Sequence, residues 1–186
     1  MNYKVLRDGR SCHGGKGKWT PNRKRSVRGE LAPCKNGLHY CRDEQVLHWL
    51  GEGIWEFVDL TPDETIDNGD KMVTRAGKVT KKYETWNERT QRLFAVDCAR
   101  IAVNRYAQDA QRELLHACLD VAVGCAEGFM DDAARTAAWD AAGAAAGTAD
   151  AGAAWDAAGA AARAEQYAIL LRYLNGEEGP FVEVEA

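Results

Sequence analysis

The hydrophobic pattern of this chain changes once, near residue 85. Before that point the apolar residues fall in short β-rich runs that partly alternate with polar residues, at 3–6, 54–60, 71–74 and 78–84. After it they recur at the three- and four-residue spacing of an amphipathic helix. A period of two suits a half-buried strand and a period of 3.6 suits a helix, so the two parts need different structures. The sequence therefore predicts an α+β protein.

The first half, residues 1–84, is expected to form a small mixed sheet with one short helix. The stretch Asp67-Asn68-Gly69-Asp70 is typical of a tight turn between two strands. Asp43 is a suitable N-cap for a short amphipathic helix over the following residues, and Gly51 is its expected stop.

The second half, residues 85–175, is expected to form an antiparallel bundle of about four helices, followed by a tail at 176–186. Residues 85–88 (TWNE) have the pattern of a capping box and predict the first helix start. Asp109 is expected to open a second helix that Gly128 ends. Its expected buried stripe is Leu114, Leu115, Cys118, Val121, Ala122 and Cys125. Acidic residues at 131–132 favour a third helix start, and Thr148 or Asp150 can cap a fourth helix.

Eight residues, WDAAGAAA, occur twice, at 139–146 and at 155–162. On one continuous helix the two tryptophans would lie roughly 160° apart, which would waste one of them. A break near residue 147 instead gives two antiparallel helices that each present a tryptophan and a small-residue face. We expect a duplicated packing unit. The alternative is an acidic aromatic surface for a partner, made of Trp139, Asp140, Trp155 and Asp156.

Positive charge is concentrated at the N-terminus. The first 35 residues hold ten Lys/Arg and two acids and so carry a net charge of +8. The remaining residues carry −12, which gives the chain its net charge of −4. The basic segment 16–28 includes Arg23, Lys24 and Arg25 and could contact nucleic-acid phosphates. The alternative is a solvated loop that its like charges keep extended. Trp19 is the one base-stacking side chain that this segment offers.

Thiols and imidazoles gather early in the chain. Cys34, His39, Cys41 and Cys12 offer four possible zinc ligands, although their spacing matches no standard zinc pattern. The alternative is that the cysteines are small buried residues and His39 is a hydrogen-bonded core residue. A cysteine nucleophile, Cys34 or Cys41 activated by His39 or His48, is a third interpretation. No cofactor is otherwise expected.

Several classes of protein are not indicated. No run of eighteen apolar residues predicts a membrane span, and the first ten residues lack the apolar core of a secretory signal. The expected location is a cytoplasm with reduced thiols. The HGGKG stretch at 13–17 lacks the ending of a phosphate-binding loop.

The N-terminal half resembles a widespread group of tailed-bacteriophage proteins to which no activity is assigned. They share a Y-K-V strand, a C-x-x-G-[LF]-H-[FY]-C core, a D-K-x-V-T segment and a later tryptophan. The matching residues here are Tyr3-Lys4-Val5, Cys34, Gly37, Leu38, His39, Tyr40, Cys41, the run from Asp70 to Thr74, and Trp86. The likeness covers about residues 1–95. The Ala-rich second half is similar to helical tails of actinobacteriophage proteins and to helices of bacterial immunity proteins. The resemblance implies phage origin and an actinobacterial host.

The order of strand, helix and acidic strand also resembles ADP-ribosyltransferase-like folds, which hold NAD. This resemblance implies a site made of Arg7, His39, Tyr40 and Glu56.

Three hypotheses follow. The first is a non-catalytic phage accessory protein that binds a host protein in the host cytoplasm, for example to counter a defence system, with a virion role left open. The second is an NAD- or nucleotide-binding protein. The third is nucleic-acid association through segment 16–28. The sequence does not give the oligomeric state.

Overall fold

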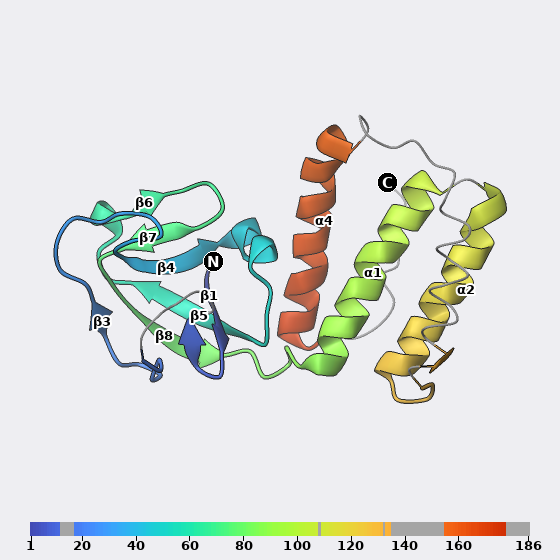
Figure 1. The fold of residues 1–186 in the computed structure, drawn as a ribbon, viewed down its shortest axis with the longest axis horizontal. Helices are drawn as coiled ribbons and strands as arrows, with labels where there is room; N and C mark the ends of the chain where they lie inside the picture. Colours follow the sequence, from blue (N-terminus) through green and yellow to red (C-terminus); the bar gives the residue numbers. More distant parts are fainter. Residues whose placement is uncertain (12–16, 108, 132, 135–154, 178–186) are drawn as a thin grey trace. The chain divides into compact units, whose positions relative to one another are not determined.

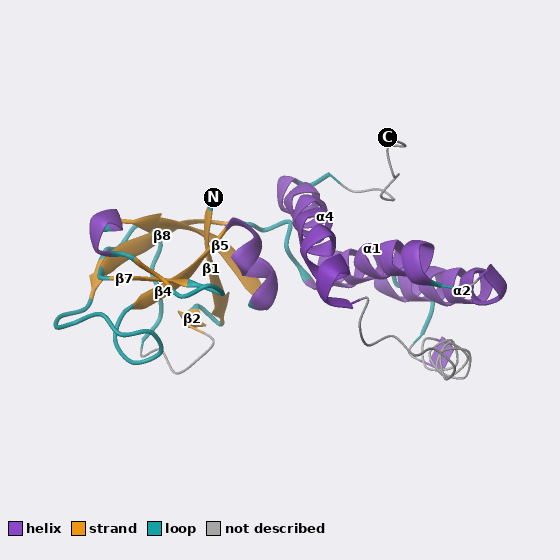
Figure 2. Ribbon diagram, turned by 90° about the horizontal axis from the view of Figure 1, so that it is seen from above, coloured by secondary structure: helices purple, strands orange, loops and turns teal. Residues whose placement is uncertain are grey.

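The computed structural model describes residues 1–11, 17–107, 109–131, 133–134 and 155–177. The chain divides into two compact units, Met1–Asn87 (unit 1) and Glu88–Ala186 (unit 2). Among the described residues, the strands belong to unit 1 and the α-helices to unit 2 (Figure 1, Figure 2). The expected α+β class is confirmed.

Unit 1 is built on an antiparallel sheet. Its strands are β1 (Asn2–Arg7), β2 (Arg10–Ser11), β3 (Arg25–Ser26), β4 (Leu38–Arg42), β5 (Gly53–Asp59), β6 (Ile66–Asp67), β7 (Met72–Thr74) and β8 (Ala76–Lys82). Their order is β3-β8-β5-β1-β4-β7-β6, and β2 pairs with β1. Every pairing among the described strands is antiparallel, where a mixed sheet was expected. Two short 3₁₀ helices, η1 (Asp43–His48) and η2 (Pro62–Glu64), complete the unit.

The sheet curls back on itself because β7 and β8, which lie near opposite ends of the strand order, are the two halves of one bent strand. Arg75 alone separates β7, which pairs with β4, from β8, which pairs with β5 (Figure 1). Where the two ends meet, the Leu60 amide donates to the Ala76 carbonyl at 2.9 Å, and the Thr61 and Thr74 hydroxyls lie 2.9 Å apart. The result is a small, barrel-like unit.

Aromatic rings fill the interior of this barrel. The buried cluster consists of Leu6, Trp19, Leu38, Tyr40, Phe57, Met72 and Val79. The Phe57 ring stacks on Tyr40 with centroids 4.6 Å apart and meets Trp19 edge-on at 6.1 Å. A Cβ atom added to Gly77 would lie 2.1 Å from Phe57 Cζ, so the Phe57 ring occupies the space that any larger residue at 77 would need.

The carboxylate of Asp59, at the end of β5, joins three strands. Its Oδ1 accepts hydrogen bonds from the Thr74 hydroxyl at 2.6 Å and from the Thr61 amide at 2.9 Å. Its Oδ2 accepts from the Tyr40 hydroxyl at 3.1 Å and from the Thr65 hydroxyl. Burial alone would raise the pKa of Asp59, but these hydrogen bonds outweigh it and lower the pKa below its usual value. Burial, reinforced by the Asp59 charge, raises the pKa of Tyr40, so its hydroxyl stays a donor.

Unit 2 contains α1 (Glu88–Tyr106), α2 (Asp109–Ala126) and α4 (Trp155–Asn175) among its described residues. Helix α1 packs on both α2 and α4, and the chain reverses direction between α1 and α2 (Figure 1). The buried Tyr173 hydroxyl of α4 donates to Asp97 Oδ2 of α1 at 2.8 Å. Arg89 donates two hydrogen bonds to Glu127, which ties the start of α1 to the end of α2.

The expected helix starts needed two corrections. Helix α1 begins at Glu88 and not at Thr85, because the buried Trp86 donates its indole N–H to the Gly51 carbonyl and so belongs to unit 1. The short helix is a 3₁₀ helix whose N-cap is Arg42; Asp43 is its first residue and pairs with the N-terminal amine of Met1.

The expectations for the later helices had mixed outcomes. Helix α2 begins at Asp109, and Gly128 beyond its end has a positive φ of 79°, as expected of a stop. Leu114 is 42% exposed, so the predicted stripe of α2 is wrong at that position. The end of α4 at Asn175 agrees with the predicted end near Leu174. The expected break near residue 147 and nearly all of the expected third helix lie outside the described residues. None of the helices searched in the described part of the chain is long and apolar enough to cross a membrane.

Replacing Asp59 by alanine should destabilise unit 1. The change removes all four hydrogen bonds, and one bond to a charged group contributes about 1.5–3 kcal/mol. We expect a loss of about 3 kcal/mol or more in the free energy of unfolding by urea, because the change leaves the buried Tyr40 and Thr74 hydroxyls without this acceptor. Asp63→Ala, an exposed carboxylate on η2, is the matched control and should change it by less than about 0.5 kcal/mol.

The lowered pKa of Asp59 also fixes the sign of the pH effect. Its contribution is complete above its unfolded pKa, near 3.8, and is lost as the pH falls through the lower folded value. The difference in the free energy of unfolding between wild type and Asp59→Ala should therefore become smaller only below about pH 4. A difference that stays constant down to pH 2 would contradict the role given to this carboxylate.

Candidate nucleic-acid interface

Part of the basic segment is fastened to the barrel. The Trp19 amide donates to the Gly9 carbonyl at 2.7 Å, and the Asn22 amide donates to the Val79 carbonyl at 2.8 Å. Strand β3 pairs with β8, and beyond it the Val27 amide donates to the Arg75 carbonyl at 3.0 Å. Backbone hydrogen bonds at Trp19, Asn22 and Val27, together with the pairing of β3, therefore tie this exposed segment to the sheet.

Trp19 anchors this segment and cannot stack on a base. Its side chain is only 7% exposed, and its indole N–H donates to the Ser11 hydroxyl at 3.0 Å. The Arg25 guanidinium lies 4.7 Å and the Lys4 ammonium 5.3 Å from the ring centroid. The expected stacking residue of the basic segment is therefore a core residue, with Arg25 held against it.

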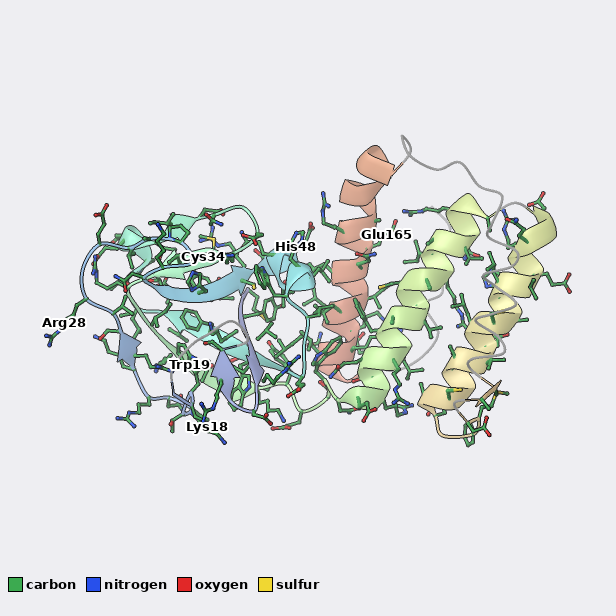
Figure 3. All side chains as sticks on the ribbon, in the orientation of Figure 1. Lys18, Trp19, Arg28, Cys34, His48 and Glu165 are labelled. Atoms are coloured by element: carbon green, nitrogen blue, oxygen red, sulfur yellow. The ribbon has the colours of Figure 1, made fainter. Side chains whose placement is uncertain are left out.

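The other cations of the segment face solvent. Lys18, Arg23, Lys24 and Arg28 are exposed, and among the described residues none of them forms an ion pair. Figure 3 shows the Lys18 and Arg28 side chains pointing outward and Trp19 pointing inward. Arg25 of β3 pairs with Gly77 of β8, so the half-buried Lys78, the next residue of β8, lies beside this segment. We call Lys18, Arg23, Lys24, Arg28 and Lys78 the basic ridge.

Some of the other basic residues of unit 1 form ion pairs. Arg75 pairs with Glu64 and donates to the Gly29 carbonyl at 2.7 Å. Arg7 pairs with Glu52 at 3.2 Å, and Lys82 with Glu84 at 2.7 Å. Arg10, Lys35, Arg42 and Lys81 are also exposed and form no ion pair among the described residues, so what distinguishes the ridge is that four unpaired cations fall within residues 18–28.

The two units carry opposite charge. Unit 1 holds 16 Lys/Arg and 12 Asp/Glu, for a net charge of +4, and unit 2 holds 8 and 16, for a net charge of −8. The overall charge of −4 therefore conceals a basic unit with a basic ridge.

The cysteine and histidine cluster makes a different contact from the one a metal or a nucleophile would need. The Cys34 amide, not its thiol, donates to His39 Nε2 at 3.0 Å, so that nitrogen acts as an acceptor. Burial first, and then the charges of Lys4 and Lys71, lower the pKa of His39. Cys34 is exposed and Cys41 is buried. In the described residues no three His, Cys, Asp or Glu side chains are grouped to hold a metal ion, and Cys12 lies outside them.

The four residues of the ADP-ribosyltransferase-like interpretation bond to separate partners. Arg7 pairs with Glu52, and Tyr40 donates to Asp59. Glu56 accepts from Thr80 at 3.2 Å and from Tyr83 at 3.4 Å, while His39 accepts from the Cys34 amide. Among the described residues, no hydrogen bond or ion pair joins any two of the four.

The acidic aromatic surface cannot be followed in the structure. Trp139 and Asp140 lie outside the described residues, and of Trp155 and Asp156 only the backbone at the start of α4 is described.

Sequence reasoning missed Lys78 of the ridge. It lies far along the chain from segment 16–28, and only the pairing of β3 with β8 brings it beside that segment. The two residues of β3 give no strand signal of their own, so no local pattern could have revealed this neighbour.

No protein-family model matches this chain, and neither a curated protein nor a solved structure matches it. The likeness to the tailed-bacteriophage group stays a prediction from the motifs quoted above.

The environment of His39 predicts a pH dependence of stability. Because its pKa is lowered from 6.5 in the folded protein, the unfolded chain takes up a proton first as the pH falls. Stability should therefore decrease as the pH drops through about 6.5 and level off below the folded pKa. In His39→Gln, which keeps an acceptor for the Cys34 amide, urea unfolding at pH 7.5 and 5.5 should differ less than in wild type.

His48→Gln is the matched control, because His48 is exposed on η1. It should keep the wild-type difference between the two pH values. If His39→Gln and wild type respond equally to pH, the neutral, buried state assigned to His39 is wrong.

Proposed function

We propose that this protein is a non-catalytic nucleic-acid-binding protein whose unit 1 contacts phosphates through the basic ridge. One observation carries the proposal. The exposed cations Lys18, Arg23, Lys24 and Arg28 have no carboxylate partner among the described residues, on a backbone that β8 holds in place.

The ridge suits phosphate binding for two physical reasons. Each Lys or Arg that neutralises a phosphate releases a condensed counterion, which favours association. The backbone of the segment is already ordered by hydrogen bonds to Gly9, Val79 and Arg75, so less conformational entropy is lost on binding than with an extended loop. Phosphate contacts fix position and carry no direct sequence information, so we expect weak sequence preference.

The paired variant Arg23→Gln/Lys24→Gln tests the proposal. Arg25 is left unchanged, because it lies against the Trp19 ring and its loss would disturb the fold. Binding of a labelled nucleic acid, followed by fluorescence anisotropy at 50 mM salt, should weaken about fivefold if each surface ion pair contributes roughly 0.5 kcal/mol. The slope of log K against log salt should fall by about 1.8, or about 0.9 per lost phosphate contact.

The matched control removes the same charge elsewhere. Lys35→Gln/Arg163→Gln changes two exposed basic residues outside the ridge and should leave affinity and slope near wild type. If both double variants weaken binding equally, net charge and not the ridge drives association. If wild type shows no binding at 50 mM salt, the proposed function is wrong.

A second candidate is docking to a host protein, which the phage resemblance implies. The observation that favours it is Phe129, which is 85% exposed in the turn after α2, next to the 46% exposed Met130. Covering a Phe side chain contributes about 1.5–3 kcal/mol, so an exposed ring at this place suits a protein contact.

Phe129→Ser tests the second candidate. A tagged wild-type protein should retain a host protein from actinobacterial lysate, and Phe129→Ser should retain at least about tenfold less, by quantitative mass spectrometry. Leu114→Ser, a change at an exposed leucine of α2, is the control and should retain the wild-type amount. Equal retention by both variants and wild type would remove Phe129 from the contact.

A further inference from the structure

We infer that the ligand of the basic ridge is a double-stranded nucleic acid and not a single strand. This inference rests on the proposed function and adds the class of ligand. It depends on the aromatic side chains of unit 1, on the rigidity of the ridge and on the spacing of its charges.

Single-strand binding without sequence preference normally needs exposed aromatic rings. Each base stacked on such a ring contributes roughly five- to a hundredfold in affinity, and an electrostatic groove alone lacks this contribution. A binding face for single strands would therefore display at least one accessible ring near its cations.

The described part of unit 1 displays no exposed aromatic ring. Its buried rings are Tyr3, Trp19, Tyr40, Phe57, Tyr83 and Trp86. Of the two half-buried rings, Trp55 packs against the buried cluster, and Trp49 donates its indole N–H to the Asp70 carbonyl with Lys71 over its face. The ring nearest to the ridge in sequence, Trp19, is occupied by Ser11, Lys4 and Arg25.

The exposed ring of Phe129 does not supply the missing platform. It belongs to unit 2, whose net charge is −8, and carboxylates at Glu127 and Asp131 flank it in the sequence. Phosphates would be repelled there.

The ridge is a fixed row of charges, and this favours a stiff ligand. Adjacent strands lie about 4.8 Å apart, so Lys78 of β8 lies next to β3 and the cations that flank it. A duplex keeps its phosphates in place over about 150 base pairs of persistence length. A single strand would have to be ordered to match the row, and no stacking would offset the lost entropy.

Charge density favours the duplex as well. Duplex DNA carries one negative charge per about 1.7 Å of axis, and the counterions released per contact are greater than for a single strand, about 0.9 against 0.7. If all five ridge cations contact phosphates, the slope of log K against log salt is about −4.5 for a duplex and about −3.5 for a single strand.

The test compares two ligands on the full-length protein. A labelled 24-base-pair mixed-sequence duplex and one of its 24-nucleotide strands are titrated by fluorescence anisotropy between 50 and 200 mM salt. We expect the duplex to bind about fivefold or more tightly, with a slope no steeper than about −4.5. Arg23→Gln/Lys24→Gln should reduce the duplex slope by about 1.8, while Lys35→Gln/Arg163→Gln should not.

The outcomes separate this inference from the proposed function. If the single strand binds as tightly as the duplex or more tightly, and the ridge variant weakens it, the ridge is a nucleic-acid site and the assignment to duplexes is wrong. If neither ligand binds at 50 mM salt, or the ridge variant and its control behave alike, both the inference and the proposed function fail.

Discussion

The Asp59 carboxylate closes unit 1, and the basic ridge depends on that closure. Four donors, from β4, from β7 and from the residues that flank η2, converge on this one group, at the place where the bent strand β7–β8 meets the end of β5. Strand β8 is also the partner of β3, the two-residue strand in the middle of the basic segment. A polar cluster of the barrel therefore fixes the edge on which the cations are displayed.

The basic segment combines a high density of like charge with an ordered backbone. Like charges repel one another and tend to extend a chain, yet this segment is ordered. Trp19 resolves the conflict, because its buried ring packs beside Phe57 and Leu6 and also takes the Arg25 guanidinium over its face. Because its ring is buried, Trp19 cannot stack on a base. It instead holds in place the backbone that carries the neighbouring cations.

Local pattern was enough to predict the long elements and failed where distant contacts decide. Strands β1, β5 and β8 were predicted because their apolar runs are long and β-rich, whereas β2 and β3, with two residues each, carry no such signal. The start of α1 was placed three residues early, because the Gly51 carbonyl holds Trp86 in unit 1. Arg23 and Lys24 of the ridge could be read from composition, but the burial of Trp19 and the position of Lys78 follow from sheet pairing.

The separation of charge between the units sets the conditions under which the ridge can act. At physiological ionic strength the Debye length is about 8 Å, so a phosphate at the ridge responds mainly to the nearest cations. At 0.01 M salt the length grows to about 30 Å, and the ridge field is then summed with more of a chain whose net charge is −4. Lowering the salt concentration therefore strengthens the attraction of a phosphate to the ridge and also its repulsion by the net negative charge of the chain. Under the proposed function, the ridge would hold a nucleic acid by a few local contacts and not by the overall charge of the protein, which would suit reversible binding.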